Sequence, residues 1–278
     1  MLSRCAQRGL AYEAMSRVSG LGDNLHPRHG QRARQELEAY LRGDRNLSGK
    51  ELHSIVYRLT HGDVDRHRRA LGLVSDSMCR MRWQDLLARC SCKQLADIAW
   101  MMARVDYVSK PQIEYFCIMD RFMASSETWH PKYLSRLFWS LRKVGMSNPK
   151  AMMLAYMRIK QLGFDKVPVT YQVSLMYSLT KLRFEGRTRL RAMATRLVLR
   201  LSEFDGWDLS LFAYCVFHST LGLDLIKPIY DQAVKLLNEH QLKSQDRDSL
   251  LKSMQLFRFE HEFASLVQNK DWFSEKKV

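Results

Sequence analysis

Two stretches of the chain decide the fold: Leu95-Ala-Asp-Ile-Ala-Trp-Met-Met-Ala-Arg-Val105 and Leu134-Ser-Arg-Leu-Phe-Trp-Ser-Leu-Arg-Lys-Val144. In both, apolar residues recur at i, i+3, i+7 and i+10, which is one face of a helix. The same pattern occurs four times between residues 91 and 240, about every 38 residues. A period of this size marks an array of supersecondary units, none of which buries its apolar face alone.

Columns of residues keep the register of the repeat, at successive separations of 39, 38 and 37 positions. One apolar column consists of Ile98, Leu137, Leu175 and Phe212. An aromatic column consists of Trp100, Trp139, Tyr177 and Tyr214. The aromatic column lies on nearly the opposite side of the helix, so we expect the helix to be buried between two neighbours.

Each repeat is predicted to contain a second helix. These helices are expected at residues 111–123, 149–162, 188–201 and 226–238. Pro111 and Pro149 stand at equivalent positions in the first turn, where proline costs no hydrogen bond. No segment alternates with period two, so we expect no strands. The sequence therefore predicts an all-α fold, a right-handed superhelical array of helical hairpins (an α-solenoid) with about 38 residues per repeat.

The segments around the four hairpin repeats at 91–240 have their own signals. Residues 47–90 begin with the capping box Ser48-Gly-Lys-Glu51 and are expected to hold degenerate helical repeats. Residues 21–46 are interpreted as a flexible basic linker because glycine, proline and histidine occur in their first half. Residues 241–278 are expected to form a C-terminal capping helix and a tail.

The first 20 residues have the composition of a mitochondrial transit peptide. Arg4, Arg8 and Arg17 occur with a single acid, Glu13, among Ala, Ser and Leu. An ordinary basic amphipathic N-terminus is the alternative interpretation. Import into the mitochondrial matrix is the expected localisation.

The net charge of +15 indicates an acidic partner, such as nucleic acid, an anionic membrane or an acidic protein surface. Fifteen cations and two acids lie between Lys132 and Arg200. A solvated surface usually mixes charges of both signs, so this segment is predicted to contact phosphate. No apolar run approaches the roughly 20 residues that a membrane span needs.

Catalytic and cofactor motifs are lacking. The sequence has no glycine-rich phosphate loop, no His-Glu-x-x-His and no glycine-flanked serine. His61, Asp63, Asp65 and His67 are interpreted as solvated polar residues rather than metal ligands. The six cysteines lack zinc spacing and are expected to be free core thiols. We therefore expect a protein that is not an enzyme and has no cofactor, metal or small-molecule substrate.

The solvent-facing side of each first helix is the expected binding surface. Spacings of 3, 4 and 3 select these positions: Gln94, Asp97, Met101, Arg104; Tyr133, Arg136, Ser140, Lys143; Tyr171, Ser174, Ser178, Lys181; Asp208, Leu211, Cys215, His218. Tyrosine and cations on one face can stack a base and hold a phosphate. Arg189, Arg196 and Arg200 are expected to share a face of the neighbouring second helix. The predicted RNA-binding residues are Tyr133, Arg136, Arg142, Lys143, Tyr171, Lys181, Arg183, Arg189, Arg196 and Arg200. A merely solvated polar face is the alternative.

The two opening stretches resemble the core of octotricopeptide and heptatricopeptide repeats, and of the related FAST-kinase-domain family of mitochondria. These families are helical-hairpin arrays that mostly bind, process or stabilise organellar RNA, or belong to mitochondrial ribosomes. The chain departs from them in two ways. It has no strand-rich acidic C-terminal segment for a domain of restriction-endonuclease type, and its array is short. A short array favours a subunit of a larger particle.

The sequence thus predicts a mitochondrial helical-repeat protein that binds single-stranded or structured mitochondrial RNA. Its expected role is in organellar RNA processing or stability, or within a mitochondrial ribosomal or ribonucleoprotein particle with other subunits. The alternative is a structural adaptor of a mitochondrial complex, which binds protein rather than RNA. A continuous basic strip on the repeats favours the first hypothesis, and an apolar patch with dispersed charge favours the second.

Overall fold

The computed structural model of the chain describes residues 32–33, 35–37, 39–40, 46–60, 85, 87–104, 113–125 and 128–255. Within these ranges every regular element is a helix, so the predicted all-α class is confirmed. The chain divides into two compact units, residues 1–158 and 159–278, which are described separately. The predicted transit peptide, the cluster at 61–67 and the end of the tail lie outside the described residues.

The first helices of the four predicted repeats are α6 (Cys92–Arg104), α8 (Pro131–Lys143), α10 (Val169–Lys181) and α12 (Gly206–His218). Each has 13 residues, and their first residues are 39, 38 and 37 positions apart, which is the spacing predicted from the aromatic column. The apolar column of Ile98, Leu137, Leu175 and Phe212 is fully buried. The predicted core face of these helices is therefore confirmed.

The second helices are α7 (Ile113–Ala124), α9 (Pro149–Leu162), α11 (Arg187–Val198) and α13 (Ile226–Asn238). The bounds of α9 and α13 match the predicted ones residue for residue. The predicted helix at 188–201 is too long, because α11 ends at Val198 and a separate 3-10 turn follows at Leu201–Glu203.

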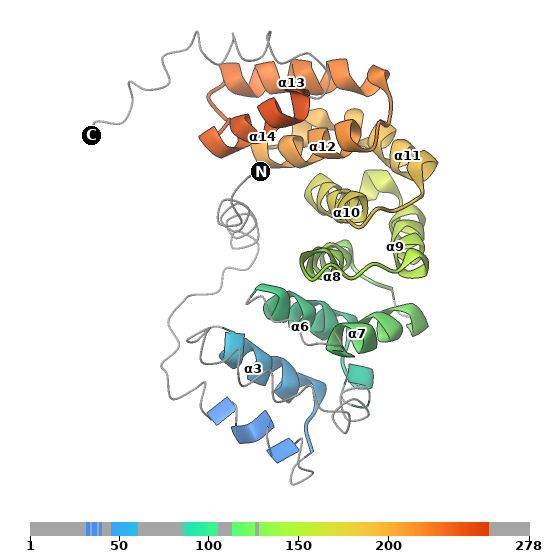
Figure 1. Cartoon of the computed structure of the whole chain (residues 1–278), viewed down its shortest axis with the longest axis vertical. Coiled ribbons are helices and arrows are strands. Elements are labelled where there is room, and N and C mark those ends of the chain that lie inside the picture. Colours follow the sequence, from blue (N-terminus) through green and yellow to red (C-terminus); the bar gives the residue numbers. More distant parts are fainter. Residues whose placement is uncertain are drawn as a thin grey trace, which may run out of the picture. The chain divides into compact units, whose positions relative to one another are not determined.

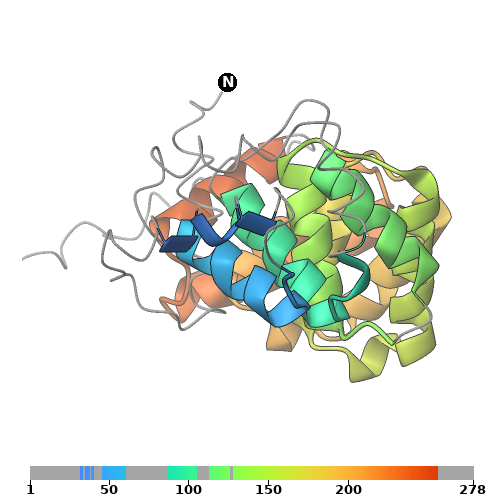
Figure 2. The same cartoon turned by 90° about the horizontal axis from the view of Figure 1, so that it is seen from below.

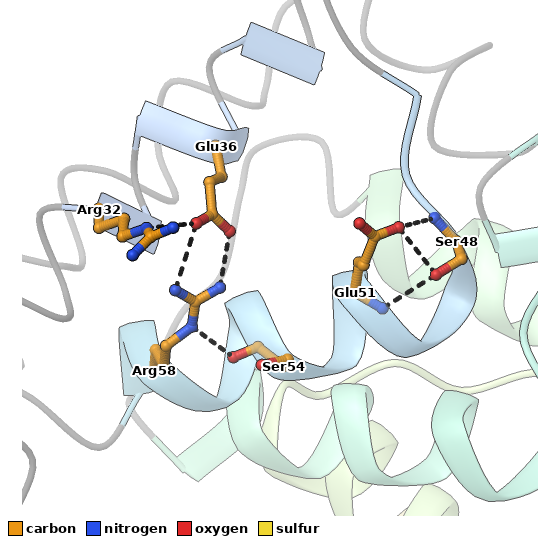
Figure 3. Close-up of polar contacts among 6 residues, drawn as sticks. All are labelled: Arg32, Glu36, Ser48, Glu51, Ser54 and Arg58. Atoms are coloured by element: carbon orange, nitrogen blue, oxygen red, sulfur yellow. Dashed lines mark hydrogen bonds and ion pairs between the residues drawn. The ribbon is translucent and has the colours of Figure 1, made fainter.

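In the first unit, α3 (Gly49–Thr60) packs against α6, and α6 packs against α8 and α7 (Figures 1 and 2). The predicted capping box opens α3. The Ser48 N–H donates to the Glu51 carboxylate at 2.8 Å, and the Glu51 N–H donates to the Ser48 hydroxyl at 3.3 Å (Figure 3). Ser91 and Gln94 form the same box before α6, with N–O distances of 2.9 and 3.3 Å. Both boxes satisfy N–H groups that a helix start otherwise leaves free.

The predicted flexible linker at 21–46 is wrong for the part of it that the structure describes. Residues 32–33, 35–37 and 39–40 are helical, and Ala33, Leu37 and Tyr40 are buried. Arg58 of α3 donates to Glu36 at 2.7 Å, and Arg32 donates to the same carboxylate at 3.2 Å (Figure 3). Apolar residues at i, i+4 and i+7 bury this short segment against the first unit.

In the second unit, α10 packs against α12, and α12 packs against α14 (Ser244–Gln255). The helices α11 and α13 also contact α12. Leu250 of α14 is fully buried. Short 3-10 turns at Phe164–Lys166 and Leu223–Leu225 precede α10 and α13 in the chain.

The same turn ends three of the first helices, but it is built from different residues. Gly145, Arg183 and Thr220 occupy the left-handed region, with φ of 74°, 60° and 48°. In each turn the next N–H donates to a carbonyl five residues earlier: Met146 to Leu141, Phe184 to Leu179, and Leu221 to Val216. Glycine adopts this conformation without strain, whereas arginine and threonine do not.

None of the helices in the described part of the chain is long and apolar enough to cross a membrane.

Candidate nucleic-acid interface

The half-buried and exposed residues of the first helices in the second unit lie mainly in one narrow stripe. The positions that form it are spaced by 4, 3 and 4 residues: Thr170, Ser174, Tyr177 and Lys181 in α10, and Trp207, Leu211, Tyr214 and His218 in α12. All eight are half-buried or exposed, whereas the other nine residues of α12 are buried. We call these eight residues the open stripe.

Several predicted solvent-facing positions are therefore wrong. The buried ones are Asp97, Met101, Arg136, Ser140, Ser178, Asp208 and Cys215. In the second unit the open stripe lies one residue earlier than predicted at the centre of each helix. The physical reason is that neighbouring helices contact α6 and α12 on more than one side, because α3, α7 and α8 pack against α6, and α10, α11, α13 and α14 pack against α12. In the second unit this stripe passes through the aromatic column, which we expected to be buried between neighbours.

Two tyrosines and two cationic or titratable side chains meet at the C-terminal end of the open stripe. The rings of Tyr177 and Tyr214 are edge to face, with centroids 5.2 Å apart. The Lys181 ammonium lies 4.1 Å from the centroid of Tyr214 and 5.6 Å from that of Tyr177. The imidazole of His218 lies 5.0 Å from the ring of Tyr214. Half-buried π surface and a positive charge thus lie side by side, with the Lys181 ammonium over one face of the Tyr214 ring.

The equivalent positions of the first unit form what we call the closed stripe: Lys93, Asp97, Trp100 and Arg104 in α6, and Lys132, Arg136, Trp139 and Lys143 in α8. Arg136 is buried, binds the Asp97 carboxylate and lies 5.3 Å over the ring of Trp100. Arg104 lies 5.6 Å over the same ring, and Arg142 lies 5.7 Å over that of Trp139. Trp100 and Trp139 are 4% and 8% exposed, so their ring faces are covered by the protein's own side chains.

The Asp97–Arg136 pair joins α6 to α8, and α3 contributes to it. The His53 imidazole of α3 lies 3.7 Å from the second oxygen of Asp97. Burial by itself raises the pKa of Asp97, but the hydrogen bond from His53 and the positive charge of Arg136 outweigh it and hold the pKa below its ordinary value. The Asp97 carboxylate is thus ionised, and its contacts join α3, α6 and α8.

The predicted RNA-binding residues of α8 and α10 are placed in different environments. Arg136 is buried, so the expectation that it faces solvent is wrong. Lys181 is exposed at the tyrosine pair, and Arg183 is exposed two residues beyond it. Four more are half-buried at the ends of their helices: Tyr133, Arg142, Lys143 and Tyr171. The ring of Tyr133 lies 5.6 Å from that of His130, which caps α8.

The expected shared face of Arg189, Arg196 and Arg200 is also wrong, because Arg200 lies beyond the end of α11. Arg189 and Arg196 are exposed on α11. The guanidinium of Arg200 donates to the carbonyls of Phe164 at 2.9 Å and Val167 at 2.8 Å. It also forms two hydrogen bonds of 2.7 Å to Glu203. Arg200 therefore holds the loop before α10 in place.

Several other arginines of the basic segment have structural partners of the same kind. Arg158 donates to the Ser125 carbonyl at 2.7 Å and covers the ring of Phe122 at 4.5 Å. Arg187 donates to the Thr220 carbonyl, and Arg191 donates to the Leu221 carbonyl and to Asp224. Backbone carbonyls at loops thus replace the missing carboxylates as acceptors. Excess positive charge in this segment is consequently a poor guide to which cations face a ligand.

Sequence reasoning missed Tyr177 and Tyr214 as candidate site residues, whereas His218 was among the positions expected to face solvent. The signal was present in the repeat, because each aromatic residue of the column is followed three or four positions later by Arg, Lys or His. On a helix such residues are neighbours on one face.

Other kinds of site receive little support in the described part of the chain. No group of three His, Cys, Asp or Glu side chains there could hold a metal ion. Cys90, Cys92, Cys117 and Cys215 are buried thiols that form no disulfide within the described residues, in keeping with the prediction of core thiols. Burial raises the pKa of the Cys90 thiol to about 11 and that of Cys215 to about 12, so both thiols are protonated at neutral pH.

No protein-family model matches the chain, and no curated protein is similar to it at a significant level. Function is therefore inferred from the two stripes and the charges around them.

Proposed function

We propose that this chain is a helical-repeat RNA-binding protein of the mitochondrial matrix. It acts in organellar RNA processing or stability, or within a ribosomal or ribonucleoprotein particle. The observation that carries the proposal is the open stripe, where Tyr177 and Tyr214 lie beside Lys181 and His218. The protein has no catalytic role in this proposal, and it needs no cofactor.

Stacking and phosphate binding supply different parts of the affinity. A base stacked on an aromatic side chain contributes about 1–3 kcal/mol and is tolerant of sequence. Lys181 supplies a phosphate contact that releases counterions and makes binding dependent on salt. Arg183, exposed two residues further along, and Tyr171, half-buried at the start of α10, extend the contact surface. The net charge of +15 favours encounter with RNA over a longer range.

Base stacking is assigned to the second unit only. A base reaches Trp100 only after displacing Arg136 from a buried carboxylate, which is costly. The cations at the edge of the closed stripe, among them Lys143, remain able to contact phosphate. The proposal also retains the right-handed α-solenoid of about 38 residues per repeat for the hairpins at 91–240, because the first helices keep that spacing.

Fluorescence anisotropy with a labelled, mixed-sequence single-stranded RNA tests RNA binding by the full chain. We expect the wild type to bind more tightly than an unrelated folded protein of equal net charge. The Lys181→Gln variant should flatten the log–log salt dependence of the affinity by about 0.7 for the lost phosphate contact. The matched control is Lys160→Gln, which removes an exposed lysine from α9, and it should leave the slope unchanged.

Equal binding by the wild type and the unrelated basic protein would refute the proposal, and the adaptor hypothesis would replace it. The matrix localisation has a separate test. A fluorescent protein that carries residues 1–20 should enter mitochondria, and a cytosolic distribution would contradict this part of the proposal.

A further inference from the structure

The helix α11 carries arginines of two kinds, and only one kind is explained by the fold. Arg187 and Arg191 hold the loop at residues 220–224. Arg189 and Arg196 are exposed, and neither has an ion pair or hydrogen bond to any residue in the described part of the chain. The sequence of α11 contains no acidic residue. The charge of these two side chains is therefore uncompensated within the helix.

The second helix α13 of the next repeat shows what a solvated outer surface looks like in this protein. Lys227 pairs with Asp231 at 2.8 Å, and Lys235 pairs with Glu239 at 4.0 Å. These pairs are spaced i and i+4, so acidic residues of α13 and its C-terminal cap balance the charges of its lysines. Such pairs are missing from α11, so its two exposed guanidinium groups are open to the carboxylates of an acidic partner.

An exposed apolar residue extends the same side of α11. Leu199, at the C-terminal cap, is 74% exposed, which exceeds the exposure of Phe116 at 46% and Met157 at 38%. A single exposed leucine is ordinary on a protein surface. Here, however, Arg189, Ala192, Arg196 and Leu199 are all exposed and follow i, i+3, i+7 and i+10 spacing. We call these four residues the α11 face. The opposite face of α11, with Leu190, Met193 and Leu197, is buried.

We propose that the α11 face docks an acidic amphipathic helix of a partner protein. Seven residues of helix span about 10 Å, so two carboxylates seven residues apart on the partner match Arg189 and Arg196. A guanidinium binds a carboxylate through two parallel hydrogen bonds, which fixes the orientation of the partner. An apolar residue one turn further along the partner covers Leu199.

An acidic protein helix fits this face better than RNA does. A phosphate backbone has no apolar surface to cover Leu199. The α11 face also lacks an aromatic ring on which a base could stack. The proposal concerns a different helix from those that carry the open stripe, so it does not depend on the proposed RNA binding.

The test uses the full chain and a labelled helical probe peptide with two glutamates seven residues apart and a leucine one turn beyond. We expect saturable binding that weakens with salt. The Arg189→Gln/Arg196→Gln variant should bind at least about tenfold more weakly, the change expected for loss of a charge-assisted hydrogen bond. The Leu199→Ser variant should also bind more weakly, and a probe with glutamine in place of glutamate should not bind.

The matched control is Lys227→Gln/Lys235→Gln, which removes the same number of charges from α13 and should leave binding unchanged. Circular dichroism verifies that each variant is folded. Absence of probe binding to the wild type, or equal losses in the α11 and α13 variants, would overturn the proposal. The proposal would also be overturned if the α11 variant lost RNA affinity while the wild type did not bind the peptide. The α11 face would then be an RNA-binding surface.

Discussion

The open and closed stripes occupy the same repeat positions, yet they differ in burial and in ion pairing. Both contain an aromatic residue that is followed by Arg, Lys or His near the end of each first helix. The difference lies one turn earlier in the helix. In the first unit Asp97 and Arg136 form a buried ion pair there, whereas in the second unit the equivalents are Ser174 and Leu211, which are half-buried and unable to form one. The closed stripe therefore stabilises the packing of the first unit through a buried ion pair, which the uncharged Ser174 and Leu211 of the open stripe cannot form.

The same repeat position is thus part of the core in one unit and half-exposed in the other. Charge at a repeat position does not predict its role, because a partner at the equivalent position of the next helix can neutralise it. What matters is the fraction of each ring and each cation that solvent can reach.

Arg136→Met in the closed stripe should have the largest effect. It leaves the Asp97 carboxylate buried and without its main counter-charge, which costs about 3–5 kcal/mol of unfolding free energy. Denaturant unfolding monitored by circular dichroism measures this loss. The double variant Asp97→Leu/Arg136→Met should recover most of it, because replacing both partners with apolar residues leaves no charge buried. An unchanged denaturation midpoint in the single variant would mean that the closed stripe is not held by this pair.

The two units should respond to pH in opposite directions. Burial and the nearby Asp205 carboxylate raise the pKa of Asp208 to about 7, against the lowering effect of the Thr170 hydroxyl, which donates at 2.7 Å. Because the folded pKa is raised from 3.8, the folded state retains a proton that the unfolded chain loses. Stability from this group is therefore lost as pH rises from about 4 to about 7.

The Asp208→Asn variant measures the size of this effect. Between about pH 5 and about pH 8 the wild type should lose on the order of 2 kcal/mol more unfolding free energy than Asp208→Asn does. Asp97 has a lowered pKa, so its contribution is present above the pKa of the unfolded chain and is lost in acid. A wild type and an Asp208→Asn variant with parallel stability profiles over this range would contradict the raised pKa.

The turns that end the first helices should give the smallest effect. The second unit places Thr220 in the left-handed region, where the first unit has Gly145. The Thr220→Gly variant should gain about 1 kcal/mol of stability because glycine adopts this conformation without steric cost. Gly145→Ala, as the reciprocal change, should lose a similar amount. Thermal unfolding of both variants gives the comparison, and a destabilised Thr220→Gly would show that the side chain contributes more than its strain costs.

Much of the helical architecture could be predicted from the sequence. The repeat register located four helices with spacings of 39, 38 and 37, and two second helices were predicted to the residue. These features depend on apolar periodicity and on capping residues, which act over a few positions along the chain. The capping box at Ser48 and Glu51 is one example.

The position of the open stripe could not be predicted by the same reasoning. Along α10 a shift of one residue separates the half-buried Tyr177 from the fully buried Ser178. The pairing of Asp97 with Arg136 depends on contacts 39 residues apart. A signal for it existed, since opposite charges stand at equivalent positions of consecutive repeats. Arg200 gave no such signal, because its acceptors are backbone carbonyls that no sequence pattern marks.

The affinity of the Tyr177→Leu/Tyr214→Leu variant for single-stranded RNA tests the central claim most directly. Leucine keeps most of the apolar volume but removes the π surface, so binding should weaken by about 1–3 kcal/mol for each ring, while the salt dependence stays as in the wild type. Tyr230→Leu, at a half-buried tyrosine of α13, is the matched control and should bind RNA like the wild type. If the double variant binds RNA as tightly as the wild type does, or if Tyr230→Leu loses as much affinity, the open stripe is not the RNA-binding surface.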